Sequence, residues 1–169
     1  MRTILVVPYN PIWPDEFEKI KGELEIALED SFISIEHVGS TSVPGLSAKP
    51  IIDIDIVIEK GTFPVVKEKL AAIGYEHVGD LEIPTREAFK YSGKEHLMEH
   101  HLYVCEDDSP ELHRHLVFRD HLRTHPEDRY RYSCIKVEMA RLHPHDIDAY
   151  LAGKSPLILE IYRKCGLIK

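Results

Sequence analysis

Residues 37–58, HVGSTSVPGLSAKPIIDIDIVI, decide the fold of this chain. The stretch has the composition of a strand end, a Gly-Ser turn, a loop of small residues and a second strand of β-branched residues. In the second strand, isoleucines alternate with two aspartates and a valine: Ile52, Asp53, Ile54, Asp55, Ile56, Val57 and Ile58. Because successive strand side chains point to opposite faces, we expect the isoleucines to enter a core together and the two aspartates to share the other face.

Asp53 and Asp55 therefore lie one pleat apart on the same strand face. Two carboxylates at that separation repel each other. Burial is costly for each of them unless a cation, a hydrogen-bond donor or a shared proton neutralises the pair. A bound divalent metal is the simplest remedy, and the alternative is a solvated strand face, where aspartates are depleted but do occur.

The Gly-Ser turn upstream of the acids suits phosphate binding. Gly39 lets the backbone approach a ligand without a Cβ in the way. The amides and hydroxyls of Ser40 and Thr41 suit phosphate oxygens, although capping of a short turn is an equally good reading and does not exclude binding. Lys49 stands before a proline and could reach a phosphate, or it could be a solvated residue at the strand entrance.

A Gly-Ser pair followed, after twelve residues, by Asp-Ile-Asp on a strand resembles the signature of the nucleotidyltransferase superfamily. In that superfamily the acids hold magnesium and the Gly-Ser turn holds nucleotide phosphates. The longer string HVGSTSVPGLSAKPIIDI is similar to the GrpB family, small bacterial proteins with that fold. Further similar segments cover nearly the whole chain: YNPIWPDEF at 9–17, FRDHLRTHP at 118–126, YSCIK at 132–136 and YLAGK at 150–154.

The resemblance implies an α/β fold of the mixed α+β kind, with a small mixed sheet flanked by helices and a helical C-terminal half. It also implies a nucleoside triphosphate as ligand, with Asp53 and Asp55 as the catalytic acids. The following basic side chains could then place positive charge over the phosphates: Arg86, Arg119, Arg123, Lys136 and Lys154. Surface salt bridges are the alternative role for them.

The metal ligands predicted beside the two aspartates are Glu99, His101 and His37. Superfamily enzymes usually add a third acid on a neighbouring strand, and this chain offers only Glu99 there, with His101 two residues further on. Magnesium prefers oxygen ligands, whereas imidazole suits manganese or zinc, so the predicted cofactor is a divalent Mg, Mn or Zn ion with a preference for Mn or Zn. We expect most histidines of the helical half to lie at the surface.

Periodicity and turn residues predict the remaining elements. The expected strands are 4–7, 32–38, 52–58, 75–78, 86–91 and 98–104, the last two forming a hairpin beside the acidic strand. The expected helices are 14–28, 64–74, 110–125, 126–142, 146–151 and 156–165. In the helix 126–142, the predicted buried stripe is Tyr130, Cys134, Val137 and Leu142.

Length and composition bound the class of protein. A chain of 169 residues suits a single domain over 1–169. Its net charge of −8 makes nucleic acid an unlikely partner. The three cysteines show no CxxC pairing, which favours a reducing cytoplasm, and no apolar run is long enough for a signal peptide or a membrane span.

Together these features predict a cytoplasmic protein that binds a nucleoside triphosphate, or a related small molecule, and transfers the nucleotidyl group to an unknown acceptor. The alternative is a non-catalytic nucleotide- or metabolite-binding module of the same fold.

Overall fold

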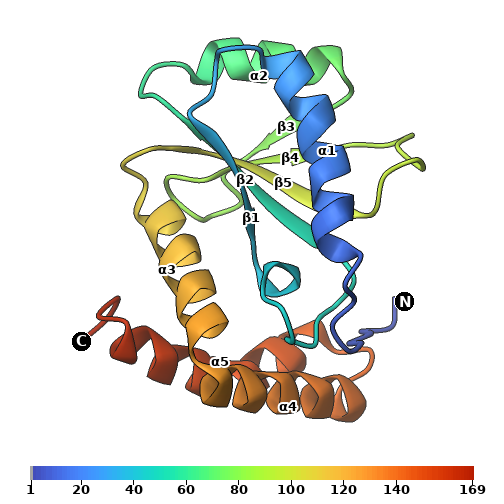
Figure 1. The fold of residues 1–169 in the computed structure, drawn as a ribbon, viewed down its shortest axis with the longest axis vertical. Coiled ribbons are helices and arrows are strands. Elements are labelled where there is room, and N and C mark those ends of the chain that lie inside the picture. The colour runs from blue at the N-terminus through green and yellow to red at the C-terminus, as the bar shows by residue number, and fades with distance from the viewer. Residues whose placement is uncertain (1) are drawn as a thin grey trace.

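The computed structural model describes residues 2–169, which form one mixed sheet with helices on both faces (Figure 1). The elements in chain order are α1 (Trp13–Leu28), β1 (Ser34–Val38), the short 3₁₀ helix η1 (Ser40–Ser42), β2 (Ile52–Ile58), α2 (Phe63–Ala72), β3 (Glu76–Gly79), β4 (Glu87–Lys90), β5 (His100–Glu106), α3 (Pro110–Thr124), α4 (Pro126–Leu142) and α5 (Ile147–Lys164). The predicted mixed α/β class is confirmed.

The five-stranded sheet has the order β1-β2-β5-β4-β3. Strand β2 pairs with β1 in the antiparallel sense and with β5 in the parallel sense, so the acidic strand lies inside the sheet. Strands β4 and β5 form the predicted antiparallel hairpin beside it. The C-terminal end of β1 and the N-terminal end of β5 therefore both lie beside the N-terminal end of β2. There Val38 and His101 are the two neighbours of Asp53.

The isoleucine face of β2 packs as the alternation predicts. Ile52, Ile54 and Ile56 have no exposed surface, and they belong to a core shared with α1 and α2. Burying an isoleucine side chain contributes about 1.5–3 kcal/mol, so this face anchors the strand firmly. The acidic face of β2 is consequently turned toward α3 and the helical half of the chain.

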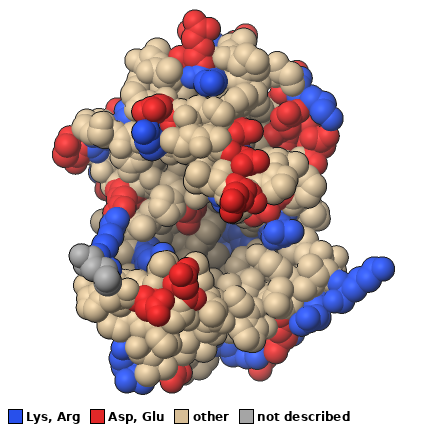
Figure 2. Space-filling model, turned by 180° about the vertical axis from the view of Figure 1, so that it is seen from behind, with Lys and Arg blue, Asp and Glu red and all other residues tan. Residues whose placement is uncertain are grey.

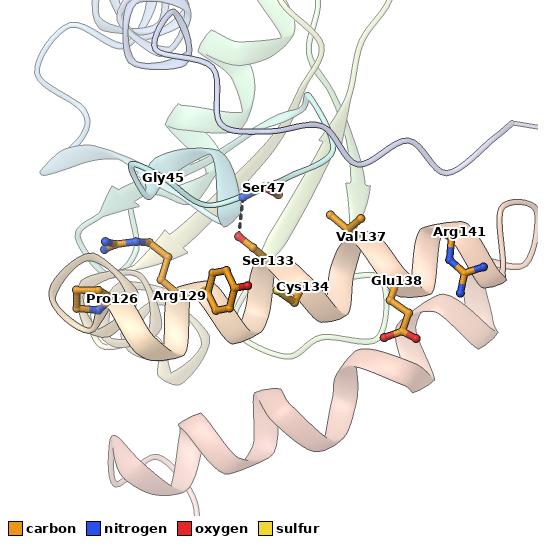
Figure 3. A pocket seen from close by; sticks show the side chains of 10 residues that line it. Gly45, Ser47, Pro126, Arg129, Ser133, Cys134, Val137, Glu138 and Arg141 are labelled. Carbon is orange, nitrogen blue, oxygen red and sulfur yellow. Dashed lines mark hydrogen bonds between the residues drawn. The ribbon is translucent and has the colours of Figure 1, made fainter.

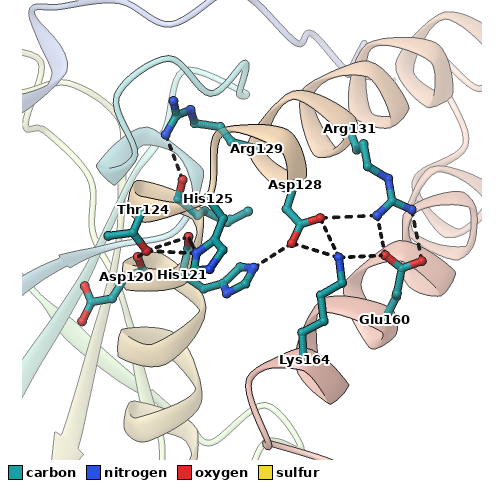
Figure 4. Close-up of polar contacts among 10 residues, drawn as sticks. Asp120, His121, Thr124, His125, Asp128, Arg129, Arg131, Glu160 and Lys164 are labelled. Atoms are coloured by element: carbon teal, nitrogen blue, oxygen red, sulfur yellow. Dashed lines mark hydrogen bonds and ion pairs between the residues drawn. The ribbon is translucent and has the colours of Figure 1, made fainter.

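The C-terminal helices are joined by packing and by ionic contacts. Ser109 caps α3 by accepting a hydrogen bond from the backbone N–H of Leu112, as predicted. A second apolar cluster lies between the η1 loop and the three helices: Val43, Leu46, Leu122, Tyr132 and Ile161. Figure 4 shows the ionic contacts, in which Asp128 of α4 faces His121 of α3 and Lys164 of α5.

Three local predictions are wrong. Residues 4–7 make no strand, only a single bridge between Val7 and Ala48. The expected helices at 146–151 and 156–165 are one continuous helix, α5, with Pro156 inside it. Packing of α5 against α4 along its length outweighs the local cost of the missing proline N–H.

The predicted buried stripe of α4 is also wrong. Tyr130 is 71% exposed, and Val137, Leu142 and Cys134 are exposed as well. The buried residues of α4 are Asp128, Tyr132, Lys136 and Ala140. The helix therefore turns two charged groups inward. Asp128 meets His121 and Lys164 on the neighbouring helices, whereas Lys136 meets the hydroxyl of Ser40.

The outward side of α4 lines a hollow of about 710 Å³, shown in Figure 3, where Cys134 and Val137 lie below the Gly45–Ser47 loop. None of the predicted site residues lies in this hollow. Within residues 2–169, no helix is both long and apolar enough to cross a membrane.

Candidate phosphate-binding cleft

A cleft of about 280 Å³ lies between the Gly-Ser turn, the ends of β2 and β5, and the three C-terminal helices. Its lining comprises Gly39, Ser40, Thr41, Lys49, Ile51, Asp53, His101, Phe118, Arg119, Leu122, Tyr132, Lys136, Tyr150 and Lys154. Figure 2 shows the face opposite to that of Figure 1, where a hollow separates the upper and lower halves and Lys and Arg side chains reach into it. The cleft thus gathers most of the residues that the sequence indicated for phosphate binding.

The Gly-Ser turn is held against the first aspartate. Gly39 has a φ of 72°, and a Cβ at this position would meet the Oδ2 atom of Asp53 at 2.2 Å. Only glycine permits both the left-handed backbone and this close approach. The turn continues directly into η1, and Gly39, Ser40 and Thr41 line the cleft.

Three lysines in the cleft lack a carboxylate partner. Lys136 and Lys154 are 3% and 9% exposed, and the ion pairs among residues 2–169 include neither of them, nor Lys49. The Nζ atom of Lys136 donates to the hydroxyl of Ser40 at 2.5 Å. Burial, reinforced by the charge of Lys154, lowers the pKa of Lys136 well below its usual range, and burial together with Lys49 lowers that of Lys154 to about 8.

Two of the lysines lie over tyrosine rings of their own helix. The Nζ atom of Lys136 is 4.9 Å from the ring centre of Tyr132, and that of Lys154 is 4.5 Å from the ring centre of Tyr150. Lys49 approaches the same Tyr150 ring at 5.6 Å. A ring face stabilises an ammonium group only partly, so the cleft remains short of negative charge.

Among residues 2–169, Asp53 is the one acidic residue in the cleft lining. It lies opposite His101 in the parallel register of β2 and β5, and the Nδ1 atom of His101 donates to its Oδ1 atom at 2.9 Å. This hydrogen bond raises the pKa of His101. The neighbouring strands therefore bring together two residues predicted to act at the site.

Asp55 shares the strand face with Asp53 but does not line the cleft. It has no exposed surface, and its Oδ2 atom accepts a hydrogen bond from Nδ1 of His115 at 2.6 Å. The other ring nitrogen of His115 is 3.1 Å from Glu111. Burial raises the pKa of Asp55. For His115 burial alone would lower the pKa, but the hydrogen bond to Asp55 and the negative charges of Asp55 and Glu111 together outweigh it, and the pKa is raised.

Two predicted metal ligands lie apart from the acids. His37 is opposite Ile54, so it faces the core, where it stacks on Phe17 at 4.7 Å and bonds Thr41 at 2.9 Å. Burial lowers its pKa to about 4. Glu99 pairs with Arg2 instead. Across residues 2–169, no group of three or more His, Cys, Asp or Glu side chains is arranged to hold a metal ion.

The three predicted arginines differ in whether they line the cleft. Arg119 lines the cleft, but it is already paired with Glu36 and Asp120, each at 2.9 Å. Arg123 donates to the carbonyl of Ser42 outside the cleft. Arg86 lies over the ring of Tyr103 at 4.0 Å, also outside the cleft.

Sequence reasoning missed His115, Tyr132 and Tyr150. The segments YSCIK and YLAGK each hold a tyrosine and a lysine four residues apart, a spacing that places both on one helix face. That signal was available for the two tyrosines. His115 stands four residues after Glu111, but nothing in the spacing connects it to Asp55, which is sixty positions away.

The fold places the chain in a class of known structures. It superposes on Cid1 in complex with its short product ApU with a TM-score of 0.54 at 12% identity, over 78% of this chain and 42% of that one. This likeness shows the nucleotidyltransferase fold.

The GrpB protein family model matches residues 3–164, and the chain belongs to that family. A crystal structure of the conserved protein GrpB from Enterococcus faecalis superposes with a TM-score of 0.83 at 33% identity, covering 95% of this chain and 96% of that one. UPF0157 protein YqkA of Bacillus subtilis is 36% identical over 93% of this chain and 46% of its own length. UPF0157 protein PA4798 of Pseudomonas aeruginosa is 37% identical over 94% of this chain and 66% of its own length. This chain thus spans less than two thirds of both UPF0157 relatives.

Proposed function

We propose that this chain binds a nucleoside triphosphate, or a related small phosphate compound, through the cleft. The observation that carries the proposal is the group of three lysines, Lys49, Lys136 and Lys154, which share one hollow without a carboxylate partner. A phosphate chain would supply the missing negative charge. Charge-assisted hydrogen bonds from buried lysines to phosphate oxygens are strong, and they would restore the favourable charged state of these groups.

The turn at Gly39 adds to the binding side of the cleft. Its open backbone and the hydroxyl of Ser40 suit a phosphate oxygen, and Lys136 already orients that hydroxyl. Asp53 stands beside the turn with His101 bonded to one of its oxygens. Asp53 therefore places one negative charge directly beside the turn.

Nucleotidyl transfer is the second candidate function. The fold class and the position of Asp53 next to the Gly-Ser turn favour it. In such a reaction a divalent ion neutralises the charge of the phosphates. The residues present do not fit a two-aspartate site for it, because His115 occupies one oxygen of Asp55 and Asp55 is shut away from the cleft. That contact favours a binding module over a transferase.

Incubation of the purified protein with each labelled nucleoside triphosphate, with magnesium or manganese and with protein or RNA acceptors, separates the two functions. Binding without release of pyrophosphate is the expected result. Pyrophosphate release that is lost in Asp53→Asn would establish transfer instead. If the wild type binds none of the triphosphates and does not differ from Lys136→Met, both functions are rejected.

The metal preference is tested by calorimetric titration of wild type and His101→Ala with magnesium, manganese and zinc. If His101 is a ligand, manganese and zinc affinity falls selectively in the variant, because imidazole suits these ions. Equal affinities in both proteins would leave His101 as a residue that positions Asp53. The Asp53→Asn, Asp55→Asn double variant is the matched control for any carboxylate-held metal.

A further inference from the structure

One residue of the cleft lining carries a buried hydroxyl group that makes no hydrogen bond to another described residue. Tyr150 lines the cleft and has no exposed surface, and within residues 2–169 its hydroxyl has no hydrogen-bond partner. A buried hydroxyl without a partner destabilises the folded state, and such groups are rare in native proteins. A ligand that accepts a hydrogen bond would remove this cost.

The two tyrosine rings of the cleft are buried, and lysines lie over them. Lys136 lies over Tyr132, while Lys49 and Lys154 both lie over Tyr150. Phe118 packs edge-to-face against Tyr132 at 5.7 Å between ring centres, and the imidazole of His101 is bonded to Asp53. Proteins that bind nucleobases commonly stack them on free aromatic faces, and neither tyrosine offers one, because Tyr132 and Tyr150 are 5% and 0% exposed.

The remaining lining groups select an anion with several oxygens. Three ammonium groups and the hydroxyls of Ser40 and Tyr150 are donors, and Asp53, already bonded to His101, is the one carboxylate. This set of donors therefore matches a phosphate chain.

We propose that the cleft recognises the phosphate chain of its ligand and is indifferent to the base, with the Tyr150 hydroxyl donating to a phosphate oxygen. This inference rests on the proposed function and narrows it. Inorganic tripolyphosphate is then the minimal ligand, and a nucleoside attached to it extends outside the cleft without a specific contact.

Calorimetric titration of wild type with tripolyphosphate, ATP, GTP, CTP and UTP at one ionic strength tests base indifference. The expected affinities of the five compounds agree within about threefold, and adenosine does not bind. One triphosphate binding more than about tenfold tighter than tripolyphosphate would overturn this inference and leave the proposed function standing. No binding by any of the five compounds would contradict both.

Tyr150→Phe tests the role of the hydroxyl. The variant removes one oxygen that has no partner, so its unfolding temperature in the absence of ligand should equal or exceed that of wild type. Its affinity for all five phosphate compounds should fall by about tenfold, the value expected for a lost hydrogen bond to a charged group. Tyr162→Phe, on the same helix but outside the cleft lining, is the matched control and should bind as wild type.

A Tyr150→Phe protein that binds tripolyphosphate as wild type would show that the hydroxyl does not contact the ligand. A marked loss of stability in the absence of ligand would show instead that the hydroxyl has a structural role, and this result would equally reject the assignment.

Discussion

Two buried charged side chains of α4 differ in whether side chains of opposite charge neutralise them. Asp128 and Lys136 lie eight residues apart on the inward side of this helix, and they are 4% and 3% exposed. Asp128 accepts hydrogen bonds from His121 at 2.7 Å and from Lys164 at 2.9 Å (Figure 4). Lys136 has only a neutral hydroxyl and a tyrosine ring around its ammonium group.

The pKa values of the two groups follow from these surroundings. Burial alone would raise the pKa of Asp128, but the hydrogen bonds from His121 and Lys164 outweigh burial and lower it to about 2. For Lys136 burial and neighbouring lysines act in the same direction, and the pKa falls well below its usual range. A buried charge with partners stabilises the fold, whereas a buried charge without partners is a cost that a ligand can offset.

The largest expected effect is on stability, and it comes from changing Asp128, the buried charge that has partners. Asp128→Asn removes the negative charge that faces His121 and Lys164 and replaces one of its two acceptor oxygens by an N–H donor, so the free energy of unfolding should fall by about 3–5 kcal/mol. Urea denaturation at pH 7 measures it. Glu127→Gln, at the neighbouring exposed position, is the control and should unfold as wild type. A loss in Asp128→Asn no greater than in this control would mean that the Asp128 contacts do not hold the helices together.

The next largest effect concerns the pH dependence of stability that arises from Lys154, a buried lysine of the cleft. The pKa of Lys154 is about 8 in the folded protein and about 10.5 when unfolded. Between these values the unfolded chain binds more protons, so the stability of the wild type should rise with pH from 8 to 10.5. Below pH 8 the buried ammonium costs up to about 3 kcal/mol.

Lys154→Met should remove this contribution and increase stability at pH 7. Urea denaturation at pH 7, 8, 9 and 10 measures the difference between variant and wild type, with the exposed Lys67→Met as control. A difference in unfolding free energy that does not change with pH would show that the pKa of Lys154 is the same in the folded and unfolded protein. Lys154 would then not be a buried charge that destabilises the fold.

A smaller effect, of about tenfold, is expected on ligand affinity. Lys136→Met removes a donor that directs both Ser40 and the ligand, so tripolyphosphate affinity should fall by about tenfold or more. The same change should raise the stability of the ligand-free protein, because it deletes a buried charge without a partner. Titration and denaturation of the same sample check the two opposite signs. Both quantities falling together would place Lys136 among structural residues.

The smallest effect is expected at the outer edge of the Asp128 contacts. Arg131 and Glu160 pair with each other, yet their side chains are 42% and 44% exposed. Exposed ion pairs contribute little to stability, so Glu160→Gln should unfold within experimental error of wild type. A loss approaching that of Asp128→Asn would mean that the network acts as one unit and not through its buried member.

Local rules were sufficient for most of the framework. Alternation in residues 52–58 predicted which side of β2 enters the core, and the cap at Ser109 predicted where α3 begins. These features depend on neighbours within a few residues, whose geometry is set by the backbone. A common site for Gly39 and Asp53 was expected too, from the similarity of the surrounding string to a known family.

Only the tertiary structure decided which charges are paired. Periodicity predicted an apolar inward stripe on α4, but the folded helix turns Asp128 and Lys136 inward. The family resemblance also implied equal roles for Asp53 and Asp55, whereas His115 engages only Asp55. The partners that neutralise a side chain, or leave it for a ligand, come from segments distant in the sequence. A period of two or of 3.6 residues tells which residues share a face, but not what that face meets.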